Sequence, residues 1–167
     1  VDWPPGHVAA YLVDCEEPIL FDAGMAGEEA GEELDAALAA ADRERADIDH
    51  LVVTHPHTDH VGQVSDLLEA GDPTVYAPET VEERFQRDPE ALGETVRKNA
   101  TAAGVQGGPL DEAVEMSVES LKRDSTLLPS AEVDEWLGMG GTVDIGPYSF
   151  ETVHTPGHQA DHLCYLA

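Results

Sequence analysis

The sequence predicts a layered α/β fold in a single domain. Its first half alternates short apolar runs of strand length with stretches in which apolar residues recur at helical spacing. A long helical stretch then interrupts this alternation, and strand-like segments separated by turn residues return near the C-terminus. With 167 residues, 41% of them hydrophobic, the chain is long enough to bury a substantial core.

The first element is a predicted hairpin. Residues 8–14 form an apolar run, Glu16-Glu17-Pro18 supplies the turn, and Ile19 begins a second run that ends at Asp22. Asp22 directly precedes Ala23-Gly24, and two interpretations of it stay open. It either caps the loop, or it is a carboxylate that orients metal ligands from behind.

A helix, a strand, a second helix and a short strand follow the hairpin. Residues 27–41 carry apolar side chains at helical spacing, with glutamates in the first turns, where the helix dipole favours them. We expect a strand at 50–54, a short amphipathic helix at 61–68 and a brief strand at 74–76. This alternation indicates an α/β layer arrangement.

Helical periodicity dominates from about 78 to 137. Glycines and prolines at Gly107-Gly108-Pro109 and Pro129 divide the stretch. We expect three or four helices that form an insertion into the α/β core. Such an insertion often covers a site as a lid, but a packing element without substrate contact fits the pattern too.

Strands return after the insertion. Residues 142–145 and 148–154 predict a hairpin around Gly146-Pro147. The second of these strands leads into Thr155-Pro156-Gly157-His158, and another strand is expected at 163–166.

The charge balance is extreme, with 35 acidic against 8 basic residues and a net charge of -27. The carboxylates are spread along the chain and the hydrophobic periodicity survives between them, so we expect a folded protein with an acidic surface. Such self-repulsion is tolerable at ~1 M salt, where the Debye length is about 3 Å. We therefore predict the cytoplasm of a salt-accumulating halophile, with an ordinary acidic domain as the alternative.

The same composition argues against two classes of partner. Nucleic acid is a poor partner for so negative a chain. No apolar run approaches the ~18 residues that a membrane span needs. Cys15 and Cys164 have no framework spacing and are predicted to be small buried residues, although Cys164 lies near histidines and a metal role stays open.

The strongest chemical signal is the stretch Thr54-His55-Pro56-His57-Thr58-Asp59-His60, which directly follows an apolar run. Imidazole and carboxylate are ligands that zinc prefers. Alternation places His55, His57 and Asp59 on one side of an extended segment, and a turn must then bring in His60. Because one ion cannot easily take four ligands from so short a loop, we expect two adjacent ions to share them.

A fifth ligand is predicted at His158. It occupies a Pro-Gly turn at the end of a strand, as His55 follows another strand, and two such loops can assemble one site. We expect His162 either to be structural or to support the metal ligands from behind, and His154 to pack or support. His7 and His50 are expected to be structural.

In these elements the chain resembles the metallo-β-lactamase superfamily, most closely its glyoxalase II-like branch. The resemblance rests on Asp22-Ala23-Gly24 after a strand, on the motif from Thr54 to His60, and on Thr155-Pro156-Gly157-His158. It implies an αββα sandwich, here its N-terminal portion with a helical insertion. It also implies a bridging aspartate and a last histidine, for which no position precedes Ala167, so we expect an incomplete domain.

The resemblance further implies a site with two metal ions. His55, His57 and His158 would hold one ion, and Asp59 and His60 the other. Zinc is the expected metal, with iron or manganese as other possibilities.

The expected function is a zinc-dependent hydrolase that uses a metal-bound hydroxide on a small thioester, ester or lactone. Asp59 could orient the nucleophile and take its proton, which makes it the expected catalytic residue. Three alternatives stay open: a mononuclear iron oxygenase of the persulfide dioxygenase kind, a truncated chain that binds metal without catalysis, and a nuclease, for which the chain has few basic groups.

Overall fold

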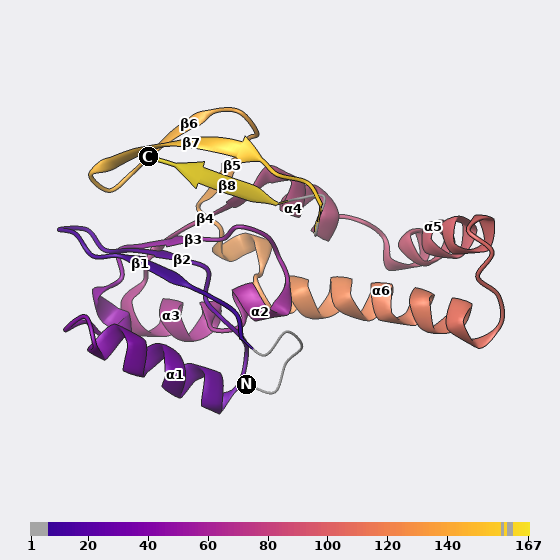
Figure 1. Cartoon of the computed structure of the whole chain (residues 1–167), viewed down its shortest axis with the longest axis horizontal. Coiled ribbons are helices and arrows are strands. Elements are labelled where there is room, and N and C mark those ends of the chain that lie inside the picture. The colour runs from indigo at the N-terminus through magenta and orange to yellow at the C-terminus, as the bar shows by residue number, and fades with distance from the viewer. Residues whose placement is uncertain (1–6, 158, 160–161) are drawn as a thin grey trace.

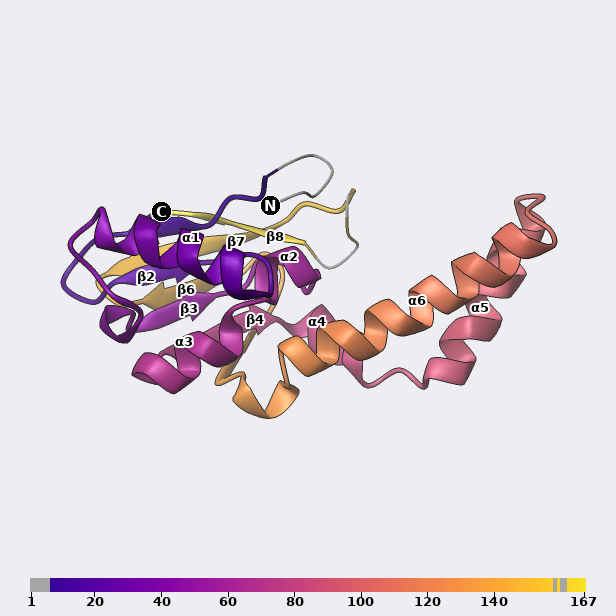
Figure 2. The ribbon, with the colours of Figure 1, turned by 90° about the horizontal axis from the view of Figure 1, so that it is seen from below.

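The computed structural model describes residues 7–157, 159 and 162–167. Two β-sheets stack face to face, and helices cover the outer face of the first sheet (Figures 1 and 2). A pair of helices projects to one side of these layers. No helix among the described residues combines the length and apolar character needed to cross a membrane.

The first sheet has five strands in sequence order. The first two pair antiparallel and the others pair parallel, with Leu20 opposite Leu51 and Leu51 opposite Val75. Its strands are β1 (Tyr11–Val13), β2 (Ile19–Phe21), β3 (His50–Val52), β4 (Thr74–Pro78) and β5 (Glu135–Leu137). After their first residues, His50 and Thr74, the central strands β3 and β4 are buried, because both faces of this sheet are covered.

Helices α1 (Glu28–Ala39) and α3 (Val64–Gly71) cover one face of the first sheet. Alternation along the strands sends one set of side chains to the helices and the other to the second sheet. The helix-side core contains Leu20, Leu38, Leu51, Val53, Val64, Leu67 and Val75. The predicted single helix at 61–68 is wrong in its bounds, because α2 (Thr58–Val61) begins earlier and α3 begins after the break at Gly62-Gln63.

The second sheet has three antiparallel strands: β6 (Thr142–Ile145), β7 (Tyr148–His154) and β8 (Leu163–Leu166). A second core lies between the two sheets and contains Ile19, Val52, Tyr76, Leu137, Val143, Ile145, Phe150 and Leu163. The order of layers is therefore helix, sheet, sheet, which is three of the four layers of the expected sandwich. Both cysteines are free and half-buried rather than buried as predicted.

The insertion lies between β4 and β5. Its helices are α4 (Glu79–Phe85), α5 (Pro89–Ala102) and α6 (Gly108–Leu127), followed by the 3₁₀ turn η2 (Ser130–Glu132); another 3₁₀ turn, η1 (Arg45–Asp47), precedes β3. The predicted end at about 137 is too late, because Glu135–Leu137 pairs with β4 as β5. Helices α5 and α6 pack as an antiparallel hairpin whose tip points away from the sheets, while α6 also contacts α2 (Figures 1 and 2).

Candidate metal centre

The motif after β3 changes from strand to helix within a few residues. The backbone at His57 is extended, with φ −69° and ψ 146°, and α2 starts at Thr58. The carbonyl oxygen of His57 accepts from the amides of His60 at 2.8 Å and Val61 at 3.1 Å. This turn brings His60 back toward His55, as convergence of the four side chains requires.

Three imidazole rings gather around the ring of His55. Its centroid lies 4.0 Å from that of His60, 4.9 Å from that of His57 and 5.0 Å from that of His162. His55 is only 2% exposed, so the cluster is anchored in the protein interior. His162, expected to be structural or to support the ligands from behind, thus lies inside the cluster.

Asp22 holds two parts of the motif at once. Its carboxylate accepts from the Thr54 amide at 2.8 Å, from the Thr54 hydroxyl at 2.8 Å and from His60 Nδ1 at 2.8 Å. Asp22 is 4% exposed and adopts φ 62°, a left-handed conformation that aspartate tolerates better than most residues. Asp22 thus caps the loop, as the first interpretation expected, and bonds to His60; that it orients metal ligands stays a prediction.

The hydrogen bonds also select the tautomers of two histidines. An ionised carboxylate only accepts, so Thr54 Oγ1 donates to Asp22 and must accept from His55 Nδ1, 3.0 Å away. His60 Nδ1 likewise donates to Asp22. Both rings therefore present the lone pair of Nε2, which is the arrangement that buried carboxylates and hydroxyls impose on metal-binding histidines.

The surroundings of His60 shift its pKa. Burial lowers its pKa, but the hydrogen bond with Asp22 and the charges of Asp22 and Asp59 outweigh burial, and the pKa of His60 is raised. Its Nε2 lies 3.8 Å from an Asp59 oxygen. A cation at this nitrogen must therefore compete with a proton.

Neighbouring segments fix the position of α2. The amide of Ala23 donates to the carbonyl of His60 at 2.6 Å, and that of Gly62 donates to the carbonyl of Gly24 at 2.8 Å. The buried Gln63 side chain donates to two further carbonyls of the 22–27 loop. These bonds hold the segment that carries Asp59 and His60 against the loop that carries Asp22.

The second sheet meets the motif from the other side. The amide of Leu163 donates to the carbonyl of Thr54 at 3.1 Å, and the Tyr165 hydroxyl donates to the carbonyl of Val53 at 3.1 Å. Thr155 Oγ1 lies 2.7 Å from His162 Nδ1 and 3.3 Å from Cys164 Sγ, which holds the His162 ring in place. His154 is exposed at the end of β7, opposite Leu163.

Gln159 is a neighbour of the cluster that the sequence did not identify, and His162, expected only to support the site, lies within the cluster. The Gln159 amide nitrogen contacts His57 Nε2, so this side chain has to move before that nitrogen can bind a cation. In the sequence, only the proximity of Gln159 to Thr155-Pro156-Gly157 could have indicated its place at the site. His158, the fifth predicted ligand, lies outside the described residues.

The donor set matches zinc in kind, with imidazole rings around the buried ring of His55 and the Asp59 carboxylate beside His60. Within the described residues, no three histidine, cysteine, aspartate or glutamate side chains are arranged to hold an ion as they stand. The residues therefore fit a metal by chemistry and tautomer, while closure around an ion requires at least Gln159 to withdraw.

This fold and site define a known class. The family model of the metallo-beta-lactamase superfamily matches residues 3–167, and the chain belongs to that superfamily. The predicted family and fold class are thereby confirmed.

Among curated proteins, the chain is 25% identical to a hydroxyacylglutathione hydrolase of Bdellovibrio bacteriovorus over 121 residues, which are 72% of this chain and 30% of that protein. It is 42% identical to the probable metallo-hydrolase YqjP of Bacillus subtilis over 57 residues, which are 34% of this chain and 18% of that protein. The chain thus spans well under half the length of these relatives.

Solved structures share the fold. A metallo-beta-lactamase family protein of Thermus thermophilus superposes with a TM-score of 0.68 at 22% identity, covering 99% of this chain and 52% of that one. The metallo-beta-lactamase GOB-18 of Elizabethkingia meningoseptica superposes with a TM-score of 0.63 at 18% identity, covering 93% of this chain and 48% of that one. This chain accordingly spans about half the length of these structures.

Proposed function

We propose that the protein is a zinc-dependent hydrolase of a small thioester, ester or lactone. The observation that carries the proposal is the bonding of Asp22, Thr54, His55 and His60, which leaves the lone pairs of two clustered imidazoles on Nε2. Packing alone gives no reason to bury a carboxylate beneath two histidines of defined tautomer. Similarity to a hydroxyacylglutathione hydrolase supports the same class of substrate.

Each predicted site residue has a role in this proposal. His55, His57 and His158 would hold one ion, and Asp59 and His60 a second. A cation bound there would lower the pKa of a water molecule to about 7 and polarise the substrate carbonyl. Asp59, half-buried at the start of α2, would orient the attacking water and accept its proton.

The charge of the chain bears on the substrate. With a net charge of -27, a small and largely uncharged molecule approaches the site more readily than a polyanion does. This supports a small-molecule substrate over nucleic acid. It also argues for assays in concentrated salt, where the self-repulsion of the protein is screened.

The test is a zinc titration of the metal-free chain together with hydrolysis of an acyl thioester. His55→Ala should weaken zinc binding at least tenfold and abolish hydrolysis. His50→Ala is the matched control, because His50 lies at the opposite end of β3 and bonds to Glu17 at 3.3 Å. Equal losses from both variants, or a chain that binds no zinc, would refute the proposal. Bound iron with oxygen consumption on a persulfide would replace it with an oxygenase.

A further inference from the structure

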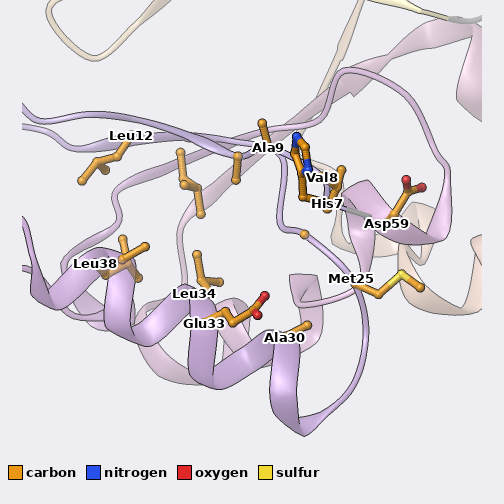
Figure 3. A pocket seen from close by; sticks show the side chains of 14 residues that line it. His7, Val8, Ala9, Leu12, Met25, Ala30, Glu33, Leu34, Leu38 and Asp59 are labelled. Atoms are coloured by element: carbon orange, nitrogen blue, oxygen red, sulfur yellow. The ribbon is translucent and has the colours of Figure 1, made fainter. Parts of the chain in front are cut away.

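An apolar groove lies between β1 and α1, beside the metal-binding motif (Figure 3). Its volume is about 300 Å³, at the lower end of the range for small-molecule sites. Residues 7–10, which lead into β1, form one wall together with Leu12 of β1 and Leu20 of β2, and one face of α1 forms the other. The lining residues are His7, Val8, Ala9, Ala10, Leu12, Leu20, Gly24, Met25, Ala30, Glu33, Leu34, Ala37, Leu38 and Asp59.

The shape of the groove depends on the side chains along one face of α1. Ala30, Leu34 and Leu38 recur at four-residue spacing and so lie along one helix face. From Ala30 to Leu38 the helix rises about 12 Å, which sets the length of the wall. Alanines on both walls leave the space unfilled, and Leu20 and Leu38, each 2% exposed, are the buried residues of its lining.

One end of the groove reaches the proposed site. Leu12 and Leu38 lie at the far end, and Met25 and Asp59 lie at the near end (Figure 3). Asp59 lies in the first turn of α2, and one of its oxygens lies 3.8 Å from His60 Nε2. A chain that lies in the groove therefore has its end next to the residue proposed to orient the attacking water.

We propose that this groove binds the uncharged aliphatic acyl chain of the substrate, with the scissile carbonyl at the Asp59 end. The assignment rests on the proposed function, since it extends the same site. Ten of the fourteen lining residues are apolar alanine, valine, leucine or methionine, which favour a hydrocarbon chain. The carboxylates of Glu33 and Asp59 on the lining disfavour a chain that ends in an anion.

The first test measures binding without chemistry. The metal-free chain is titrated calorimetrically with 1-butanol, 1-hexanol and 1-octanol in concentrated KCl. Affinity should rise about fourfold for each added methylene, the fold-change that corresponds to ~0.8 kcal/mol per buried group. Affinity that is independent of chain length would overturn the assignment.

Matched variants place the binding in the groove. Ala30→Phe should reduce the affinity for every alcohol, because Ala30 lines the groove on the same helix face as Leu34. Ala37→Phe should affect octanol most, because Ala37 precedes Leu38, which closes the far end. Ala36→Phe is the control, as Ala36 is exposed on the same helix and does not line the groove. Identical affinities in Ala30→Phe and Ala36→Phe would overturn the assignment.

The second test uses the zinc-loaded chain and acetyl, butanoyl, hexanoyl and octanoyl thioesters of one thiol. The groove predicts that kcat/KM rises with acyl length and that Ala30→Phe flattens this rise. Hydrolysis at rates independent of acyl length would overturn the groove assignment and leave the proposed function standing. Length-dependent alcohol binding without hydrolysis of any thioester would refute the proposed function, and the acyl assignment with it.

Discussion

The motif around His55 and the hairpin of α5 and α6 are held in place by different means. Around His55, polar side chains buried by more than nine-tenths bond to residues distant in sequence, as Asp22 does to Thr54 and His60. In the hairpin, the two helices pack mainly on each other, and its tip projects away from the sheets (Figure 1). One region is fixed in position by many long-range bonds, whereas the other is fixed only at its base.

This difference indicates which part of the molecule tolerates change. Catalytic groups need to be held to within a fraction of an ångström, and a buried polar network provides that positioning. The projecting tip of the hairpin does not lie over the sheets, so the structure gives no support to a lid there (Figure 2). The base of α6 contacts α2 and so supports the helix that carries Asp59 and His60.

The same substitution should have opposite effects in the two regions. A Cβ at Gly62 would lie 2.0 Å from the backbone nitrogen of Ala26, so Gly62→Ala must separate α2 from the Asp22 loop. We expect it to lower the free energy of unfolding by about 3 kcal/mol or more and to weaken zinc binding. A Cβ at Gly108 meets nothing within 4 Å, and Gly108→Ala should raise stability by about 0.5 kcal/mol.

Urea unfolding of the two glycine variants, with zinc titration of each, makes the comparison. If Gly62→Ala unfolds at the same urea concentration as the unmodified chain, the close packing of α2 on the 22–27 loop is wrong.

Two aspartates with a similar backbone conformation, Asp22 and Asp42, allow a second comparison with a smaller expected effect. Asp22→Ala removes the acceptor of three hydrogen bonds and should cost about 2 to 3 kcal/mol of stability. It should also reduce zinc affinity ~10- to 100-fold, because the tautomers of His55 and His60 are no longer imposed. Asp42→Ala is the matched control: Asp42 has a similar backbone conformation, φ 57° against 62°, but is exposed.

Equal zinc affinities in the two aspartate variants would show that Asp22 only caps the loop. A loss confined to Asp22→Ala would show that it also orients the histidines.

Much of the fold could be predicted because its elements follow local patterns. Alternating apolar runs located β2, β3 and β4, and helical spacing located α1. The short strand β5, Glu135–Leu137, was missed because it has three residues and is defined by pairing with β4 rather than by its own composition. The break between α2 and α3 was missed because the close approach of Gly62 to Ala26 is a tertiary contact.

The candidate site also has features that the sequence predicts and features that only the fold reveals. The gathering of His57 and His60 around His55 could be predicted because the three residues share one loop, whose turn brings their side chains together. The place of His162 beside His55 could not, because it depends on β8 pairing with β7 and on the bond from Leu163 to Thr54. The bonding of His55 through Thr54 to Asp22 likewise involves strands that only the fold places side by side.

Two ion pairs among the helices of the insertion differ in how deeply they are buried. Asp124 is fully buried and accepts from Arg84 at 3.2 Å, which joins α4 to α6. Arg84→Met should cost about 2 kcal/mol, since the carboxylate stays buried with Arg123 and Ser120 as its remaining partners. Arg97→Met breaks the exposed pair with Asp111 and should cost less than ~1 kcal/mol.

Neither arginine variant should change zinc affinity if the hairpin serves structure alone. A loss of zinc affinity in Arg84→Met, without one in Arg97→Met, would show that the contact of α6 with α2 tunes the site.

The smallest expected effect concerns Tyr165, whose hydroxyl donates to Val53 next to the motif. Burial, with smaller contributions from Asp22 and Cys164, raises the pKa of Tyr165 well above its ordinary value. The pKa of Tyr165 is higher in the folded than in the unfolded protein. The contribution of its protonated hydroxyl to folding stability is therefore fully present below the unfolded pKa of about 10 and is lost as the pH rises above it. The unmodified chain should therefore lose stability above about pH 10, and Tyr165→Phe should lose less of it. At neutral pH, Tyr165→Phe should cost about 1 kcal/mol for the missing hydrogen bond.

Tyr11→Phe is the control, because Tyr11 lies at the edge of the first sheet and is 67% exposed. Urea unfolding of the three proteins at pH 8 and above pH 10 measures the difference. If Tyr165→Phe and Tyr11→Phe lose the same stability between these two conditions, Tyr165 does not hold its proton through burial against Val53. The bond from β8 to the end of β3 would then be too weak to fix the second sheet against the motif.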